Sequence, residues 1–451
     1  MIIRKVIILL GLFTFVFNSS TLAEHAQKDI DFLINNADPD VNIGVKISNL
    51  SNNNIIYEKN AGRYYIPASS LKFIAVVGVI NALGKDYNFI SKLYNKGNDY
   101  FLSIEDPDFS EEDLKYFVEQ IVKDNKDQNT VNISIINNRF TLPPIIRDKT
   151  YADTQYCYGA QVTKTHVNKN CARIPVEPGD VGKPIIVQPS DNFPYQVENK
   201  SNTIEKDKND RLVVNIQNGK FIVDGTLSVS TGPINIVAVS SDNLDQIKSY
   251  LIKYLSNSGI KLSRKISVIE KEPTDIKEIA SRVKNIKDLA KKALEESDNY
   301  ITDYLLAEFA TKNNISQWDW AMGELKKSIK DKLGVDLTES DLRDASGISR
   351  NNLLTVNQFD SFLKNVATKE DLSFIKSIMA TPGNGTLKER FDGVDLYAKT
   401  GHMTGVSALV GYFYNDKKEL CSFVILINNS YQKRKLYRQL EEDIIKSVLK
   451  E

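Results

Sequence analysis

The chain has 451 residues, of which 41% are hydrophobic and 26% are charged, as in ordinary globular proteins. This length exceeds one ordinary hydrophobic core and predicts two or three domains. Lys and Arg together number 58, as do Asp and Glu, so the composition shows neither the basic field of a nucleic-acid-binding protein nor an acidic, disordered tail.

The first residues have the layout of a secretory signal peptide. Arg4 and Lys5 give a positive start, an apolar run follows over 6–17, and polar and small residues then lead to Ala23. We expect cleavage after Ala23, so that residues 1–23 are removed and the mature chain lies in the periplasm. The alternative is an uncleaved anchor, but the run is short for a membrane span of about 20 residues. No cysteine follows the run to carry a lipid.

The next segment, 24–83, predicts the first part of a domain with strands and helices. Two strands are expected at 41–47 and 54–57, with an Asn/Ser turn between them. A helix over 70–83 then follows Pro67-Ala68-Ser69. It is apolar nearly all round, which predicts a central position in its domain.

The segment 84–270 differs in character and predicts an inserted α+β domain. Two helices are expected, at 111–122 and 244–256. Short strand-like runs alternate with polar stretches, at 131–136, 184–188, 212–216 and 234–239.

From 271 to 451 the sequence predicts the second part of the first domain. Long helices are expected at 276–292, 298–312 and 317–333, and loops follow them. Strands are expected at 395–398, 406–414 and 420–428. The last helix, 433–450, has one narrow apolar face, which favours packing on these strands over a place on a membrane surface. Contact with a membrane is therefore peripheral at most.

The chain has three cysteines and three histidines. In an oxidising compartment Cys157 and Cys171 could pair, and two free thiols are the alternative. Cys421 lies in an apolar strand-like run and indicates a small buried side chain. No histidine lies at ligand spacing from a cysteine, so no metal or other cofactor is expected; the histidines are His25, His166 and His402.

Three short motifs carry one catalytic pattern: Ser-x-x-Lys, Ser-x-Asn and Lys-Thr-Gly. A serine at a helix start has its lysine one turn further on the same side. This lysine acts as a base only when it loses its proton, which burial and a neighbouring cation favour. The second serine relays the proton, and the lysine of the third motif supplies that cation.

Context selects among several copies of the first two motifs. Ser69 with Lys72 follows Pro67-Ala68 and opens a buried-looking helix, whereas the other Ser-x-x-Lys pairs lie in or beside amphipathic helices, at Ser281, Ser361, Ser373 and Ser447. Ser-Asp-Asn begins at Ser190, which lies in a loop, at Ser241, which suits an N-cap, and at Ser297, which lies between two helices. Lys-Thr-Gly occurs once, at Lys399-Thr400-Gly401.

With these motifs in order, the chain resembles the class C low-molecular-mass penicillin-binding proteins, the D-alanyl-D-alanine carboxypeptidase/endopeptidases with an inserted domain. The resembling stretches extend over the mature chain: Pro67-Ala-Ser-Ser-Leu-Lys72, Asp106-Pro107, Asp153-Thr-Gln-Tyr-Cys157, Asn170-Cys171, Ser297-Asp-Asn299, Asp344-Ala-Ser-Gly-Ile-Ser-Arg350, Gly385-Thr-Leu387 with Arg390, Ala398-Lys-Thr-Gly401 and Gly405-Val-Ser-Ala-Leu.

The resemblance implies a β-lactamase/transpeptidase-like α/β (α+β) catalytic domain and an acyl-enzyme reaction on peptidoglycan stem peptides. It implies that Ser69 is the nucleophile and Lys72 its base, and that Ser297 carries the proton to the leaving D-alanine. Asn299 would orient the peptide and Lys72. Lys399 and Thr400 would hold the carboxylate beside Gly401. Backbone N–H groups of Ser69 and His402 would form the oxyanion hole.

Three further features come from the resemblance. The family carries a cysteine pair at the positions of Cys157 and Cys171, which implies a disulfide. Asp153 is expected to contact an amine on the substrate side chain, or else to cap a loop. β-Lactams are expected as covalent inhibitors, because no glutamate between Asn299 and Lys399 opens the Glu-x-x-Leu-Asn pattern by which one β-lactamase class activates water.

The sequence departs from the family at His402, where a small hydroxyl residue is usual, and at Ala345, where glycine is common. His402 raises the possibility of a Ser-His-Asp triad, but the chain lacks a Gly-x-Ser-x-Gly elbow. Two further functions stay open at this point: that of a serine β-lactamase, and that of a peptidoglycan-binding protein without turnover.

Overall fold

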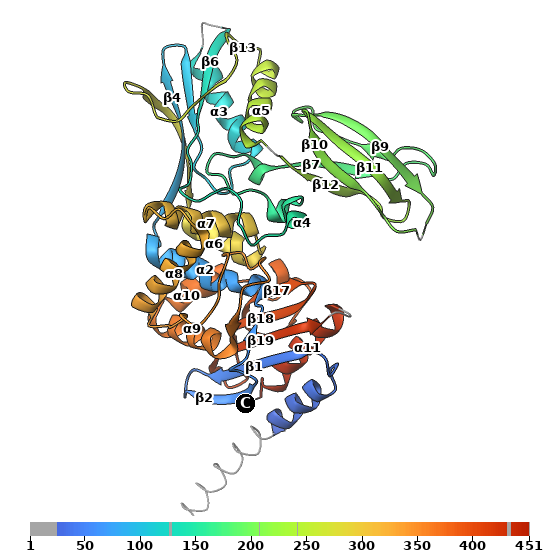
Figure 1. The fold of residues 1–451 in the computed structure, drawn as a ribbon, viewed down its shortest axis with the longest axis vertical. Coiled ribbons are helices and arrows are strands. Elements are labelled where there is room, and N and C mark those ends of the chain that lie inside the picture. The colour runs from blue at the N-terminus through green and yellow to red at the C-terminus, as the bar shows by residue number, and fades with distance from the viewer. Residues whose placement is uncertain (1–24, 126–128, 207, 241, 431–433, 451) are drawn as a thin grey trace, which may run out of the picture. The chain divides into compact units, whose positions relative to one another are not determined.

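The computed structural model describes residues 25–450 apart from 126–128, 207, 241 and 431–433 (Figure 1). The expected signal peptide, 1–23, lies outside the described residues. The chain forms two compact units. Unit 1 consists of Met1–Lys85, Ala290–Thr302 and Trp318–Glu451, and unit 2 consists of Asp86–Leu289 and Asp303–Gln317. Among the described residues, no helix is both long and apolar enough to cross a membrane.

Unit 1 is built on a five-stranded sheet to which both ends of the chain contribute, as expected. The order is β17-β18-β19-β1-β2, and every neighbouring pair is antiparallel. In Figure 1 the blue strands β1 and β2 accordingly lie beside the orange-red ones. The strands are β1 (Asn42–Asn49), β2 (Asn54–Lys59), β17 (Leu396–Met403), β18 (Gly405–Tyr414) and β19 (Leu420–Ser430).

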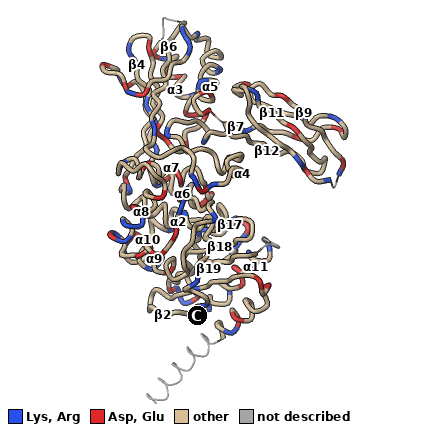
Figure 2. The backbone as a smooth tube through the Cα atoms, viewed as in Figure 1, with Lys and Arg blue, Asp and Glu red and all other residues tan. Residues whose placement is uncertain are grey.

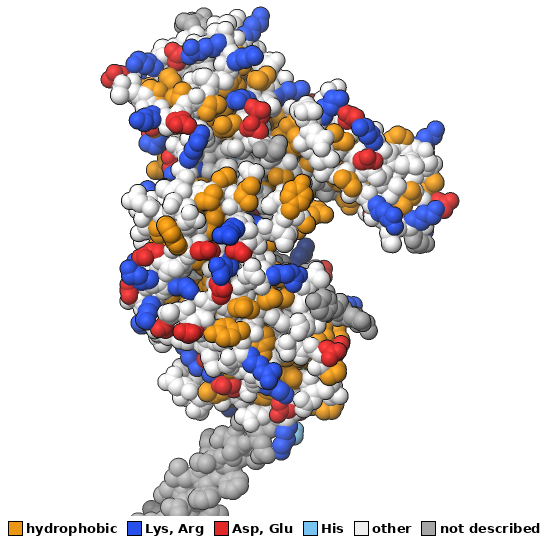
Figure 3. Space-filling model, viewed as in Figure 1, with side chains coloured by type: hydrophobic (Ala, Val, Ile, Leu, Met, Phe, Trp, Pro, Cys, Tyr) orange, Lys and Arg blue, Asp and Glu red, His pale blue; other side chains and the backbone are white. Residues whose placement is uncertain are grey.

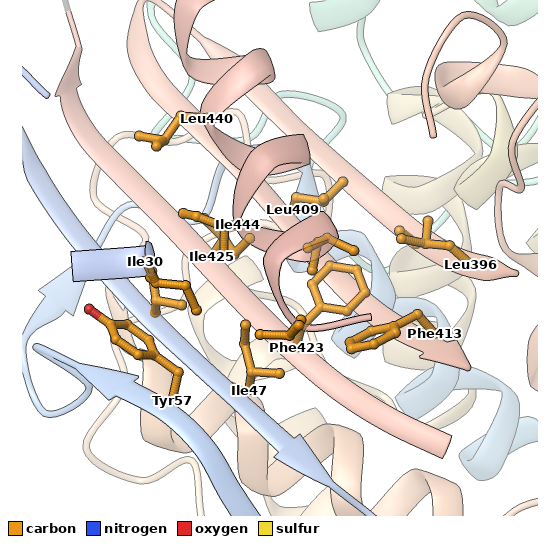
Figure 4. Packing of buried hydrophobic residues seen from close by; sticks show 14 of the residues in the cluster. Ile30, Ile47, Tyr57, Leu396, Leu409, Phe413, Phe423, Ile425, Leu440 and Ile444 are labelled. Carbon is orange, nitrogen blue, oxygen red and sulfur yellow. The ribbon is translucent and has the colours of Figure 1, made fainter. Parts of the chain in front are cut away.

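Helices cover both faces of this sheet. Phe423 and Ile425 of β19 pack in one cluster with Leu440 of helix α11 (Arg434–Ser447), and Figure 4 shows Leu440 and Ile444 beside Ile425. Ser422 points to the opposite face, because successive side chains of a strand alternate. There its hydroxyl donates to Asp360 of helix α9 (Val356–Lys369) at 3.3 Å.

Helix α2 (Leu71–Leu83) is the central helix that its apolar sequence predicts. Every residue over 71–80 is buried, and the helix ends at Gly84, whose φ of 100° only glycine adopts readily. A one-turn 3-10 helix, η1 (Ala68–Ser70), precedes it. Unit 1 also holds α8 (Trp318–Leu333), α10 (Leu372–Ile378) and the short strand pair β3 (Tyr64–Tyr65) and β16 (Leu354–Thr355). A further helix covers 25–35.

Unit 2 contains two separate hydrophobic clusters. The first lies between a mixed sheet, β13-β6-β5-β4-β15 with β14 on β6, and helices α3 (Glu111–Asp124) and α5 (Asn243–Asn257). Its strands are β4 (Asn88–Lys96), β5 (Asp99–Ser103), β6 (Thr130–Ile136), β13 (Lys261–Leu262), β14 (Ser267–Ile269) and β15 (Lys277–Asn285). The second cluster joins two three-stranded sheets built from β7 (Cys171–Glu177), β8 (Ile186–Val187), β9 (Gln196–Ile204), β10 (Val213–Gln217), β11 (Lys220–Ser228) and β12 (Ile234–Val239).

The prediction of a helix over 276–292 is wrong for the first half of this range. Lys277–Asn285 is strand β15, which pairs antiparallel with β4, and only Ile286–Glu295 is helical, as α6. The apolar residues of this stretch recur at helical spacing, but pairing with β4 overrides that local preference. Unit 2 therefore continues past the expected boundary at 270, and it also takes in most of α7 (Asn299–Lys312).

Two other expectations need correction. The N-cap of α5 is Asp242, whose carboxylate accepts from the backbone N–H groups of Leu244 and Asp245; Ser241, expected there, lies outside the described residues. The loops expected after 333 include helices α9 and α10. The N-terminal signal of α9 is present in the sequence, since Thr355 and Gln358 form a capping box.

Charged and apolar side chains are mixed over the surface. Lys and Arg alternate with Asp and Glu along both units (Figure 2). On the face shown in Figure 3, hydrophobic side chains stand in small groups among charged ones. An exposed apolar side chain is normal for a soluble domain and needs no partner.

Candidate active site

Ser69 lies in η1, immediately before α2, and its hydroxyl forms a 2.8 Å hydrogen bond with Lys72 Nζ. Lys72 is one helical turn further along and is fully buried. Ala68, just before the serine, has a φ of +48°, a backbone conformation that costs energy for a residue other than glycine. The start of α2 thus brings the predicted serine and lysine together.

A loop from the later part of the chain holds the other side of Lys72. The carbonyl of Ser346 accepts from Lys72 Nζ at 2.5 Å. The fully buried carboxylate of Asp344 shapes this loop, because it accepts from the backbone N–H groups of Gly347 and Ser349 at 2.8 and 2.9 Å. The lysine is therefore positioned from two directions.

The second predicted pair, Ser297 and Lys399, also meets. Ser297 lies between α6 and α7 with a φ of +62°, and Lys399 Nζ donates to its hydroxyl at 2.9 Å. Lys399 is fully buried and also donates to the carbonyl of Thr400 at 2.7 Å. Burial, together with the positive charge of Lys72, holds the pKa of Lys399 well below its ordinary value.

The third motif lies on β17, at the edge of the sheet. The Ala398 N–H points away from β18 and donates to the Ala380 carbonyl at 2.9 Å. Because backbone groups alternate along a strand, the N–H groups of Thr400 and His402 point to the same edge. A Cβ on Gly401 would lie 2.6 Å from the Pro67 carbonyl, so only glycine allows this close approach to η1.

These groups open onto one pocket of unit 1, of about 470 Å³. The predicted residues in its lining are Ser69, Ser297, Thr400, Gly401 and His402. The remaining lining residues were not assigned to a site from the sequence: Thr386, Arg390, Ser407, Ala408, Arg438 and Glu441.

A buried ion cluster forms the unassigned wall. Arg390 Nη2 pairs with Glu441 Oε2 at 2.9 Å, and its Nε pairs with Glu442 Oε1 at 2.8 Å. Ser407 Oγ donates to Glu441 Oε1 at 2.6 Å, which ties β18 to α11. Burial raises the pKa of Glu441, although Arg390 opposes that shift. The sequence hardly indicates this wall, because the residues of α11 predict only a helix with a narrow apolar face and no contact with a site.

Asn299 is the first residue of α7, half-buried, two positions after Ser297. Asp153 belongs to unit 2. Its carboxylate completes a capping box with Thr150 at the start of helix α4 (Tyr151–Thr154) and accepts from the hydroxyl of Tyr158 at 3.1 Å. This is the loop-capping role that the sequence left open beside a substrate contact.

Neither the cysteines nor Ser190 nor the other Ser-x-x-Lys pairs are among the described residues that line the pocket. A disulfide joins Cys157 and Cys171 in unit 2. Cys421 is buried in β19, and burial raises the pKa of its thiol to about 12. Ser190 lies in an exposed turn. The other Ser-x-x-Lys pairs begin in α9, in α10, at the end of α11 and, contrary to expectation, in strand β15 at Ser281.

Comparison with known proteins shows a family match over residues 26–446, to the D-Ala-D-Ala carboxypeptidase 3 (S13) family. The D-alanyl-D-alanine carboxypeptidase DacB of Haemophilus influenzae is 24% identical over 413 residues, 86% of this chain and 85% of the relative. The D-alanyl-D-alanine carboxypeptidase of an Actinomadura species is 20% identical over 420 residues, 86% of this chain and 78% of the relative.

The crystal structure of penicillin binding protein 4 from Haemophilus influenzae has the same fold. It superposes with a TM-score of 0.81 at 21% identity and covers 94% of this chain and 99% of that one. The expected transpeptidase-like α+β fold is thereby confirmed.

Proposed function

Because the chain belongs to the D-Ala-D-Ala carboxypeptidase 3 (S13) family, we propose that it hydrolyses the D-alanyl-D-alanine bond of peptidoglycan stem peptides through an acyl-enzyme on Ser69. The observation that carries this proposal is the pairing of Ser69 with Lys72 at 2.8 Å and of Ser297 with Lys399 at 2.9 Å beside one pocket. Cleavage of D-alanyl cross-links is part of the same proposal, since it needs the same acyl transfer.

Acylation begins when Ser69 Oγ attacks the carbonyl carbon between the two D-alanines and gives its proton to neutral Lys72 Nζ. The oxyanion accepts hydrogen bonds from the backbone N–H groups of Ser69 and His402, and the N–H of His402 points to the edge of β17 that faces away from β18. The C–N bond then breaks, and the leaving amine takes a proton through Ser297. Water, activated by the same groups, later cleaves the ester and frees Ser69.

The burial of two neighbouring lysines lowers the free-energy cost of having one of them neutral, as a general base must be. Lys72 and Lys399 are both fully buried, and the charge of Lys72 lowers the pKa of Lys399. Two neighbouring ammonium groups in a buried site repel each other, which favours a state in which one proton has left the pair. The lowered pKa of Lys399 reflects this repulsion, and acylation proceeds from the form of the coupled pair in which Lys72, 2.8 Å from Ser69 Oγ, is neutral and Lys399 keeps the remaining proton.

We place this reaction in the periplasm. The positive start, the apolar run over 6–17 and the small residues up to Ala23 support export with removal of residues 1–23. A disulfide in unit 2 agrees with an oxidising compartment. Peptidoglycan is exposed in that compartment, so enzyme and substrate would meet there.

The proposed function predicts a burst with penicillin and steady turnover with a peptide. A pentapeptide ending in D-Ala-D-Ala should release D-alanine continuously, because the small leaving group diffuses away. Penicillin should acylate Ser69 once per enzyme molecule. The resulting acyl-enzyme should decay slowly, because the leaving group of penicillin stays tethered in the site and blocks water. Rapid-mixing kinetics with fluorescent penicillin, peptide mapping and a D-alanine assay measure both.

Two outcomes would overturn the proposal. Rapid multiple-turnover hydrolysis of penicillin without release of D-alanine would indicate a β-lactamase. Absence of any covalent label on Ser69, with peptidoglycan still retained, would indicate a binding protein without turnover.

A second prediction tests the placement of Ser297. Ser297→Ala should lower kcat/KM for release of D-alanine by about 100-fold, because the leaving amine loses its proton donor. The matched control is Ser190→Ala, which alters the same Ser-Asp-Asn motif in an exposed turn and should keep the wild-type rate. Equal losses in the two variants, or wild-type turnover by Ser297→Ala, would contradict the proposed role.

A further inference from the structure

Arg438 lies on the same side of the sheet as the side chains of Thr400 and His402. Thr400 and His402 share one face of β17, because they are two positions apart. Leu409, the cross-strand partner of Thr400, packs with Leu440 of α11 in one cluster, so α11 covers this face (Figure 4). Arg438 of α11 lines the pocket together with Thr400 and His402.

Arg390 fixes the turn of α11 that presents Arg438. Its Nη2 donates to the backbone carbonyl of Arg438 at 3.1 Å, besides its ion pairs with Glu441 and Glu442. Glu441 and Glu442 therefore offset the charges of both Arg390 and Arg438, because Arg438 also acts electrostatically on Glu441. Arg438 places a guanidinium in the pocket lining beside Thr400, and the buried Lys72–Lys399 pair keeps one positive charge next to it, so the pocket suits an anionic ligand.

A peptide carboxylate matches a guanidinium in charge and shape. It carries two oxygens, which a planar guanidinium binds through two parallel N–H groups. The Thr400 hydroxyl alone offers one donor, and position 402 holds an exposed histidine rather than a second hydroxyl.

We propose that Arg438 is a specificity-determining residue: its guanidinium binds the free carboxylate at the end of the peptide, together with the Thr400 hydroxyl. This inference rests on the proposed function and deepens it. In this arrangement Arg438 of α11 makes the hydrogen bonds to the carboxylate that a hydroxyl side chain at position 402 would otherwise make. The pocket then selects peptides by the charge of their last residue.

Two peptides that differ only at the end test this role: one ends in D-Ala-D-Ala as a free acid, the other as the C-terminal amide. Arg438→Gln should lower kcat/KM for the acid by about 10- to 100-fold, chiefly through KM, as expected when a charge-assisted hydrogen bond is lost. The amide should react as with the wild type. Arg438→Lys should recover part of the preference for the acid, because it restores the charge without the planar fork.

Lys435→Gln is the matched control, since it removes the same charge from an exposed position of α11 outside the pocket lining. It should leave both rates unchanged. Equal losses on acid and amide, or an unchanged preference for the acid in Arg438→Gln, would overturn the assignment. If Arg438→Gln fails to fold, Arg438→Lys carries the same comparison. A wild-type enzyme that releases D-alanine from neither peptide would instead refute the proposed function.

Discussion

Ser69→Ala should abolish covalent labelling by fluorescent penicillin, and Lys72→Gln should slow the acylation of Ser69 by about 10⁴-fold. The first change removes the proposed nucleophile. The second removes the amine that shares a 2.8 Å hydrogen bond with Ser69 Oγ. Glutamine keeps the polarity of the site but cannot accept and return a proton.

Stopped-flow acylation kinetics measure this effect, and thermal unfolding verifies that each variant folds. Lys450→Gln is a suitable control, because Ser447 and Lys450 repeat the Ser-x-x-Lys spacing at the exposed end of the chain. That variant should acylate at the wild-type rate. Labelling of another serine in Ser69→Ala, or fast acylation of Lys72→Gln, would refute the assignment of nucleophile and base.

Gly347→Ala should lower the acylation rate by about 100-fold or more, because it displaces the nucleophile without touching its chemistry. Gly347 has a φ of +77°, and a Cβ there would lie 2.0 Å from the Ala68 carbonyl and 3.1 Å from the Ser69 backbone nitrogen. Both the backbone strain and the clash require η1 or the 344–352 loop to shift. The carbonyl of Ser346, which holds Lys72, belongs to the same loop.

Gly323→Ala provides the contrasting substitution. Gly323 lies exposed in helix α8, and a Cβ there meets no atom within 4 Å. Alanine should stabilise this helix by up to about 1 kcal/mol and leave acylation unchanged. Denaturant titration and penicillin kinetics on both variants separate stability from positioning. Wild-type acylation by Gly347→Ala would show that the close packing against η1 does not set the serine's position.

The sequence predicts the central contacts of the candidate site well because they are local. Ser69 and Lys72 are one helical turn apart, so their contact follows from the helix itself. Lys399 occurs in a motif that is present once, beside glycines that suit a strand edge. Ser297 could be selected from three copies only because it lies between two helical segments, where side chains can converge.

The sequence predicts the second wall of the pocket and strand β15 poorly, because contacts between residues far apart in the chain determine both. Arg390 and Glu441 are far apart in the chain and meet only because α11 packs on the sheet. Strand β15 shows the same limit in the fold, since its apolar residues recur at helical spacing and become a strand only by pairing with β4. Local patterns therefore predict elements and adjacent pairs, whereas the second wall of the pocket depends on the tertiary fold.

Because β1 pairs with β19, the five-stranded sheet of unit 1 can close only after the last of its strands has been synthesised. Asn42 of the first strand lies opposite Asn428 of the last, whereas most of unit 2 is one uninterrupted stretch of chain. Contacts between distant segments form late, because closing the intervening loop costs conformational entropy. Ser69 emerges early during synthesis, yet the groups that position and charge its site, from Ser346 to Lys399 and Arg438, emerge near the end. We therefore expect a nascent or truncated chain to carry the proposed nucleophile in an inert form, so that reactivity is a property of the finished molecule.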